Sequence, residues 1–190
     1  MKLIGSTSSP YVRRIRLLLA NQSYEFVNLD IYDADRDVLR RNNPALKIPV
    51  LQDGDQELFD SRVIAQYLMT QAGAEPLSWD QHNQITLIDG ANDSGVILLL
   101  SKRSGIDIDQ DRMFYNLQRE RIMMTLRTLA AQVDEGLFQA WNYPAICLYT
   151  MVDWLDFRDL VDFSSVESLL TFRNANAGQP MVAETDPRQG

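Results

Sequence analysis

The residues best suited to take part in a reaction are three serines, Ser6, Ser8 and Ser9, that stand just before Pro10. Residues 2–5 are apolar enough for a short buried strand, and proline often occupies the first position of a helix. Ser9 is therefore expected to cap a helix that follows a strand. The free N–H groups and dipole at a helix N-terminus favour an anion such as a thiolate, and a hydroxyl adds one directed donor. The alternative is that Ser9 only caps the helix.

The elements around these serines follow from apolar periodicity and turn residues. In the helix that begins at Pro10, apolar residues are expected on one face and Arg13, Arg14 and Arg16 on the opposite, basic face. The pattern then predicts a strand at 24–30, a short helix at 33–43, a strand at 48–52, a tight turn at 53–55, a strand at 57–59 and a helix at 61–71 capped by Ser61. The resulting order, βαβαββα, is the thioredoxin-like plan.

Pro49 stands at the start of the third predicted strand, where the thioredoxin-like plan usually has a cis proline. A cis peptide bond is inexpensive only before proline. It would turn the backbone N–H and C=O of Ile48 outward from the sheet edge, where they can pair with a peptide-like ligand. A trans proline at the beginning of an edge strand is the alternative.

The character of the chain changes after residue 73. Residues 74–78 form a predicted linker. From there to residue 174 the apolar residues recur at helical spacing, and a tail that contains Gly and Pro follows. Helices are expected at 79–103, 109–135, 142–159 and 164–174, the last with a capping box that begins at Ser164. The sequence therefore predicts an α/β thioredoxin-like domain over residues 1–73 and an all-α domain over residues 79–190.

Composition narrows the classes of function. Residues 1–72 carry nine basic and nine acidic side chains and residues 73–190 carry nine and seventeen, so the net charge of −8 falls on the second part. An acidic surface repels nucleic acid and anionic lipid, and no apolar run approaches the roughly 20 residues of a membrane span, so we expect a cytoplasmic protein with neither partner. The single Cys147, expected in the core, and the single His82 predict neither a disulfide nor a metal cluster.

Nearly the whole chain resembles a cytosolic-type, bacterial glutathione S-transferase. The most specific pieces are the run Asn-Pro-Ala-Leu-Lys-Ile-Pro at 43–49 and the pair Asp60–Ser61 about a dozen residues later. The resemblance implies that glutathione is the cosubstrate. Asp60 and Ser61 would hold its γ-glutamyl end, the backbone of Ile48 before Pro49 would pair with its cysteinyl unit, and Lys47 would lie near its glycyl end. The charges suit these roles, although each residue can also be an ordinary cap or a solvated side chain.

The reaction implied by the resemblance is attack of the glutathione thiolate on a small apolar electrophile, a detoxification chemistry with isomerase, dehalogenase and peroxidase variants. Ser9 would donate a hydrogen bond to the sulfur and lower the pKa of the thiol, with Ser8 and Ser6 as alternative donors. The electrophile is expected in an apolar cleft between the domains, with Tyr11 and Phe114 as candidate walls.

The resemblance also implies an assembly and leaves a second class of function open. Members of this family usually form two-fold homodimers in which the thioredoxin-like domain of one subunit meets the helical domain of the other. The alternative function is a non-catalytic module of the same fold that binds a protein partner, similar to the stringent starvation proteins. Retention of the Ile48–Pro49 and Asp60–Ser61 pairs favours the enzyme.

Overall fold

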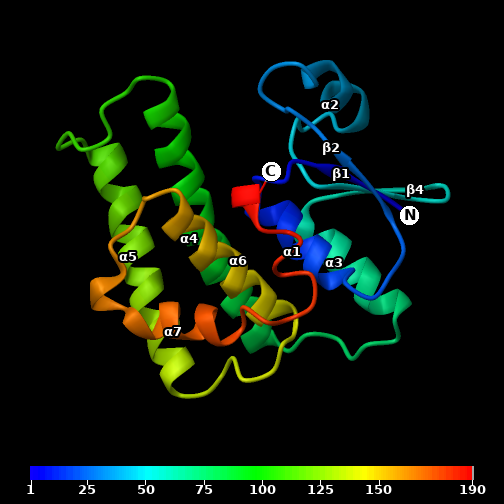
Figure 1. Cartoon of the computed structure of the whole chain (residues 1–190). Coiled ribbons are helices and arrows are strands. Elements are labelled where there is room, and N and C mark those ends of the chain that lie inside the picture. Colours follow the sequence, from blue (N-terminus) through cyan, green and yellow to red (C-terminus); the bar gives the residue numbers. More distant parts are fainter. Residues whose placement is uncertain (190) are drawn as a thin grey trace. The chain divides into compact units, whose positions relative to one another are not determined.

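The structure is a computed structural model that describes residues 1–189 (Figure 1). Its elements confirm the predicted βαβαββα order followed by helices. The first part contains β1 (Lys2–Gly5), α1 (Pro10–Leu18), β2 (Glu25–Asn28), α2 (Arg36–Asn42), β3 (Val50–Asp53), β4 (Gln56–Phe59) and α3 (Ser61–Gln71). The second part contains α4 (Trp79–Arg103), α5 (Met113–Asp134), α6 (Tyr143–Phe157) and α7 (Glu167–Ala175), with a 3₁₀ turn at Phe163–Ser165. A further 3₁₀ turn follows at Pro187–Gln189.

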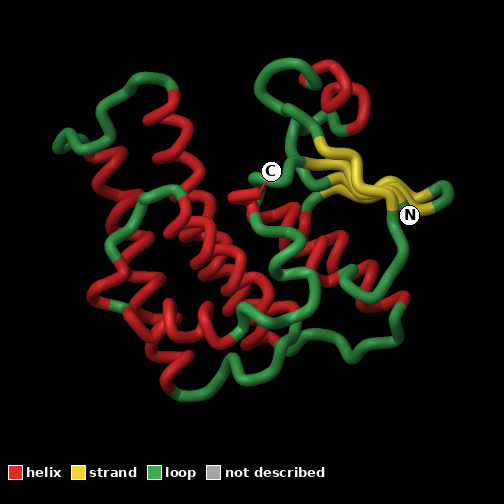
Figure 2. Tube along the Cα trace, in the orientation of Figure 1, coloured by secondary structure: helices red, strands yellow, loops and turns green. Residues whose placement is uncertain are grey.

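A mixed four-stranded sheet organises the first part, with strand order β2-β1-β3-β4. β1 pairs with β2 in parallel, whereas the β1–β3 and β3–β4 pairs are antiparallel. Helix α2 covers one face of the sheet, and α1 and α3 lie together on the other (Figures 1 and 2). Alternate residues of each strand supply the two cores, so Ile4 and Val50 pack with Leu39 of α2, while Leu3 and Leu51 are buried toward α1 and α3.

Gly5, the last residue of β1, lets α1 approach the sheet closely. A Cβ atom at this position would lie 2.4 Å from Cγ2 of Val12, which is fully buried on α1. Any larger residue would therefore push α1 away from β1. The absence of a side chain at Gly5 fixes the height at which the N-terminus of α1 stands above the sheet.

The prediction that Arg13, Arg14 and Arg16 form a basic face of α1, opposite its buried apolar face, is wrong for two of the three. Arg13 and Arg14 are both buried. The guanidinium of Arg14 lies over the ring of Tyr11, at 4.8 Å from its centroid. Arg13 is covered by a segment far along the chain, which local periodicity does not reveal.

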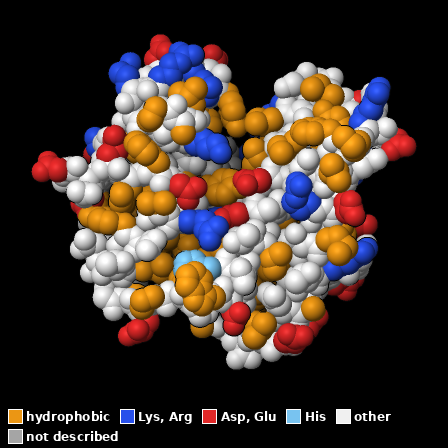
Figure 3. Space-filling model, turned by 180° about the vertical axis from the view of Figure 1, so that it is seen from behind, with side chains coloured by type: hydrophobic (Ala, Val, Ile, Leu, Met, Phe, Trp, Pro, Cys, Tyr) orange, Lys and Arg blue, Asp and Glu red, His pale blue; other side chains and the backbone are white. Residues whose placement is uncertain are grey.

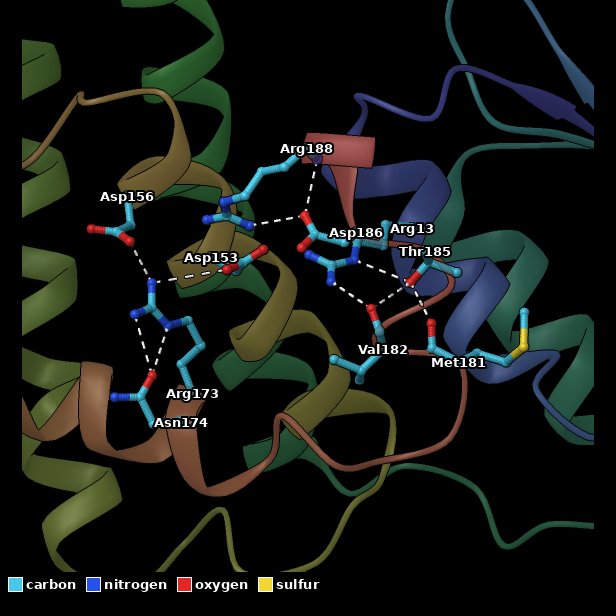
Figure 4. A network of polar contacts seen from close by, with 10 residues as sticks. All are labelled: Arg13, Asp153, Asp156, Arg173, Asn174, Met181, Val182, Thr185, Asp186 and Arg188. Carbon is cyan, nitrogen blue, oxygen red and sulfur yellow. Dashed lines mark hydrogen bonds and ion pairs between the residues drawn. The ribbon is translucent and has the colours of Figure 1, made fainter. Parts of the chain in front are cut away.

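That covering segment is the end of the chain, beginning at Gly178. The Arg13 Nε donates to the hydroxyl of Thr185 at 3.2 Å and its Nη2 donates to the carbonyl of Val182 at 3.1 Å (Figure 4). Burial alone would raise the pKa of the nearby Asp186, but the hydrogen bonds and charge of Arg188, together with the charge of Arg13, hold it below its ordinary value. The segment therefore packs as a part of the first unit.

Two compact units result. One comprises Met1–Pro76 together with the chain from Gly178 onward, and the other comprises Leu77–Ala177. The residues from Gly178 onward thus pack with the first unit, whereas the sequence predicts an all-α domain over residues 79–190 that includes them. The physical reason is the buried guanidinium of Arg13, whose donors need the acceptors that Val182 and Thr185 supply.

The helical unit is built on α4, which packs against both α5 and α6. A Cβ atom on Gly95 would lie 2.7 Å from Cδ2 of Leu155, so this glycine allows α4 and α6 to approach closely. Cys147 is buried in α6, as predicted for a core residue. Arg173 of α7 pairs with Asp153 at 3.8 Å and also with Asp156, which ties α7 to α6 (Figure 4).

The predicted start of the last helix is wrong. Ser164 does not begin a capping box but lies in the 3₁₀ turn Phe163–Ser165, and α7 begins at Glu167. The side chain of Asp162 accepts from the N–H of Ser164 at 2.9 Å, and the Phe163 side chain is buried. The carboxylate of Asp162 is the stronger local acceptor, and it moves the capping interaction to the preceding turn.

Some large apolar side chains stay at the surface. Figure 3 shows hydrophobic side chains interspersed with acidic and basic ones on one face of the molecule. Trp79 at the start of α4 is exposed and its ring lies 5.8 Å from that of His82. Among residues 1–189, no helix combines the length and the low charge needed to span a bilayer.

Candidate functional site

The strand register brings three predicted site segments to one end of the sheet. In the β1–β3 pair Ile4 stands opposite Val50, and in the β3–β4 pair Val50 stands opposite Phe59. The C-terminal ends of β1 and β4 and the N-terminal end of β3 therefore lie at the same end of the sheet. The loop 6–9 follows β1, the pair Ile48–Pro49 precedes β3, and the pair Asp60–Ser61 follows β4.

Ser9 is the N-cap of α1, as the sequence predicts. Its backbone is extended, with φ −89° and ψ 125°, and its Oγ accepts from the N–H of Val12 at 3.3 Å. Pro10 occupies the first helical position, where its missing N–H costs no hydrogen bond. Capping uses only a lone pair of the hydroxyl, so the Ser9 O–H remains available as a donor.

The other two serines interact with each other. The Oγ atoms of Ser6 and Ser8 lie 3.2 Å apart, so one hydroxyl donates to the other. The carbonyl of Ser6 accepts from the N–H of Ser9 at 3.1 Å, and the N–H of Thr7 donates to the side chain of Asn28 at 3.0 Å. These contacts hold the loop against β2. One of these two hydroxyls uses its proton within the pair, whereas capping leaves the Ser9 proton unused, so Ser9 stays the first candidate for an external donor.

At the end of β4, the structure corrects the predicted capping residue. Asp60, not Ser61, is the N-cap of α3, and its Oδ1 accepts from the N–H of Arg62 at 2.7 Å. Ser61 is the first helical residue and is buried. Asp60 has φ 72° and ψ 133°, a backbone conformation that a non-glycine residue rarely adopts. An aspartate accepts more strongly than a serine, which explains why it takes the cap.

The segment before β3 contains the remaining predicted ligands. The Ile48–Pro49 peptide bond is cis, which resolves the alternative left open by the sequence. Lys47 is exposed, Ile48 is half-buried and Pro49 is buried. The paired residues of β3 begin at Val50, so the backbone of Ile48 lies outside the ladder with β1.

The sequence placed Asn43 at the start of the run 43–49 but predicted no role for its side chain, which hydrogen-bonds to two backbone groups of this segment. Its side chain is buried although the four residues after it are exposed. The available signal was an asparagine directly before Pro44, because asparagine side chains hydrogen-bond to backbone groups a few residues along and so initiate turns.

The two candidate walls for an electrophile belong to different units. Tyr11 lies on α1, half-buried, with its ring over Arg14. Phe114 lies in the first turn of α5, is 53% exposed and packs edge-to-face on Tyr115 with ring centroids 5.3 Å apart. Their joint role as walls of one pocket stays a prediction. Within residues 1–189, His, Cys, Asp and Glu side chains form no group of three that could hold a metal ion.

Comparisons with known protein families agree with the first unit. Residues 3–76 match the model of the glutathione S-transferase N-terminal domain. The chain is 34% identical over 171 residues to the uncharacterized GST-like protein YibF of Escherichia coli K12, with 83% of each chain covered. Glutathione S-transferase 4 of Zea mays is 37% identical over 93 residues, which span 47% of this chain and 42% of the maize protein.

Solved structures resemble the whole chain. A glutathione transferase family member from Pseudomonas fluorescens Pf-5, solved with bound glutathione, superposes with a TM-score of 0.82 at 26% identity and covers 98% of both chains. A glutathione S-transferase from Methylobacillus flagellatus KT superposes with a TM-score of 0.84 at 22% identity, again over 98% of each chain. The second likeness shows the fold alone.

Proposed function

Because this chain belongs to the glutathione S-transferase family, we propose that it binds glutathione in its first unit and activates the thiol for attack on a small apolar electrophile. The observation that carries the proposal is the strand register, which places the ends of β1 and β4 and the start of β3 at the same end of the sheet. The glutathione bound to the Pseudomonas fluorescens relative supports the same ligand here.

In this proposal the γ-glutamyl end binds where β4 meets α3. The conformation of Asp60 costs about 1–3 kcal/mol, and such strain is typical of ligand sites. Oδ1 of Asp60 caps α3, so we expect Oδ2 to accept from the α-ammonium group of glutathione. The first N–H groups and the dipole of α3 favour the α-carboxylate beside it.

The rest of the tripeptide binds along the segment before β3. The backbone of Ile48 lies outside the sheet ladder and can pair with the cysteinyl unit. The exposed Lys47 carries the positive charge that the glycyl carboxylate requires. Asp60 and Lys47 thus offer a negative partner for the α-ammonium group and a positive partner for the glycyl carboxylate.

Ser9 supplies the chemistry in this proposal. A free thiol has a pKa of about 8.5 and is only a few per cent thiolate at neutral pH. The N-terminus of α1 and the O–H of Ser9 stabilise the thiolate, and Ser9 keeps its own proton while it does so. The nucleophile becomes abundant without a general base.

The proposal predicts that the protein is retained on immobilised glutathione and released by free glutathione. Calorimetry should then give a saturable heat, and the ultraviolet absorbance of the bound thiolate should persist to lower pH than in free glutathione, because the site favours the anion. A protein that shows neither retention nor heat does not bind glutathione. Loss of both signals would leave a non-catalytic module for a protein partner as the remaining function.

The exposed side chains of α5 support a second part of the proposal, a two-fold dimer. Met113, Leu117 and Met124 are 78%, 46% and 59% exposed. Their spacing of four and seven residues puts them on one face of the helix. Exposed apolar side chains that share one helix face are typical of a protein interface, and a second copy of the chain is the occupant we propose.

We expect the wild-type protein to have the mass of a dimer at micromolar concentration, and Leu117→Glu with Met124→Glu to have that of a monomer. Charges buried without a partner destabilise an interface by several kcal/mol. Leu137→Glu is the matched control, since Leu137 is 54% exposed but lies beyond α5. Analytical ultracentrifugation distinguishes the outcomes. A monomeric wild type would refute the dimer, and a dimeric double variant would refute this interface.

A further inference from the structure

Asn43 is the one buried residue at the start of an exposed loop. Its relative exposure is 1%, whereas residues 44–47 that follow it are all exposed. It stands directly after α2, and its N–H donates to the carbonyl of Leu39 at 2.9 Å to end that helix. A buried amide side chain between a helix and an exposed loop needs partners for both its oxygen and its nitrogen.

The Asn43 side chain finds both partners in the loop itself. Its Nδ2 donates to the carbonyl of Lys47 at 2.8 Å, and its Oδ1 accepts from the N–H of Ala45 at 2.9 Å. Its backbone carbonyl accepts from the N–H of Leu46, also at 2.9 Å. Leu46 has φ 55°, which leucine rarely adopts, so these hydrogen bonds hold a conformation that the loop would not keep alone. Asn43 therefore determines the path from α2 to Lys47.

The contact with the Lys47 carbonyl has a geometric consequence for the next residue. A peptide unit is planar, and in the trans form its C=O and N–H point in opposite directions. The cis bond of this segment follows Ile48, so the unit between Lys47 and Ile48 is trans. By fixing the Lys47 oxygen, Asn43 also fixes the direction of the Ile48 N–H.

We propose that Asn43 is a positioning residue for glutathione, because its amide aims the Ile48 N–H and places Lys47 without touching the ligand. This inference rests on the proposed function, in which Ile48 and Lys47 bind the cysteinyl and glycyl units. Only an amide satisfies the loop at this position. An aspartate would set a carboxylate oxygen against the Lys47 carbonyl, and a serine is too short to bridge both ends.

The adjacent Asn42 provides a matched control. It is half-buried, its Nδ2 donates to the carbonyl of Val38 at 2.7 Å, and its Oδ1 accepts from Gln52 at 3.1 Å. It thus makes as many side-chain hydrogen bonds as Asn43, but to α2 and β3 rather than to the loop. Asn42→Asp and Asn43→Asp add the same charge one residue apart.

We expect Asn43→Asp and the uncharged Asn43→Ser to raise the Kd for glutathione about five-fold, the equivalent of one hydrogen bond, and Asn42→Asp to change it less than about two-fold. Titration calorimetry on the full chain measures each Kd, and thermal unfolding confirms that the variants are folded. The serine variant separates loss of the hydrogen bond from charge repulsion, and serves if the aspartate variant does not fold.

A double-mutant cycle distinguishes positioning from general destabilisation. If Asn43 acts through the loop, the effects of Asn43→Ser and Lys47→Ala on Kd will be less than additive, whereas those of Asn43→Ser and Asp60→Ala will add. Additivity in both cycles, or an equal loss in Asn42→Asp, would overturn the inference. Wild-type affinity in Asn43→Ser would do the same, while a wild type that fails to bind glutathione would instead overturn the proposed function.

Discussion

Ser9→Ala will raise the pKa of the thiol of bound glutathione by about one to two units. A hydrogen bond to a charged group is worth about 1.5–3 kcal/mol, and each pKa unit corresponds to 1.36 kcal/mol. At neutral pH the thiolate fraction, and with it the rate of any transfer reaction, should fall by up to about ten-fold for each unit of this shift. Ultraviolet absorbance of the thiolate against pH, with the protein saturated by glutathione, measures the shift directly.

Ser9→Gly separates activation of the thiol from capping of α1. Alanine at the N-cap costs about 1 kcal/mol of stability, whereas glycine costs only a few tenths, and neither offers a hydroxyl. We therefore expect both variants to show the same raised pKa but different free energies of unfolding. Coincident titrations of wild type and both variants would leave Ser9 as a cap, and would assign the activating role to Ser8, Ser6 or the backbone.

Asp60→Asn should weaken glutathione binding by about 1.5–3 kcal/mol, roughly ten-fold or more in Kd. Asparagine matches the aspartate as an N-cap and tolerates positive φ, so this variant removes the charge while it preserves the local backbone. Asp60→Ala should lose the same affinity and about 1 kcal/mol of stability in addition. Calorimetric titration and chemical unfolding of the same samples give both quantities.

Asp55→Asn is the control for net charge in that experiment. Asp55 is also exposed, but it lies in the turn between β3 and β4, at the other end of the hairpin from Asp60. It should bind glutathione as tightly as wild type. If Asp60→Asn retains wild-type affinity, the γ-glutamyl assignment fails. If Asp55→Asn weakens binding equally, long-range charge explains the effect instead of a contact.

Local signals predicted the elements whose ends they control. The bounds of α3 and α4 agree with the prediction to the residue. Gly73, with φ 66°, stops the chain from continuing as a helix after α3, and a capping box at Ser78 begins α4. The convergence of the site segments was also predictable in outline, because a βαβ unit followed by a hairpin allows few arrangements of the strands. What the sequence predicted least well was which of two adjacent polar residues caps a helix, as at Asp60 and Ser61.

The burial of Arg13 and the loop contacts of Asn43 could not be predicted from local sequence patterns. Arg13 has the spacing of a surface residue on α1, and only acceptors supplied by the opposite end of the chain allow its burial. Asn43 uses its side chain to satisfy backbone groups of an irregular loop, and such contacts have no period. Both residues depend on tertiary hydrogen bonds, which sequence spacing does not encode.

The contact of Arg13 also has a consequence for the order of events on the ribosome. Arg13 leaves the exit tunnel early, but Val182 and Thr185 follow it by 169 and 172 residues. Domains generally fold in the order in which they are synthesised. Here the guanidinium gains these two acceptors only after the whole of Leu77–Ala177 has been synthesised, so the unit whose synthesis starts first is completed last. A nascent chain that stalls before Gly178 never completes its N-terminal unit.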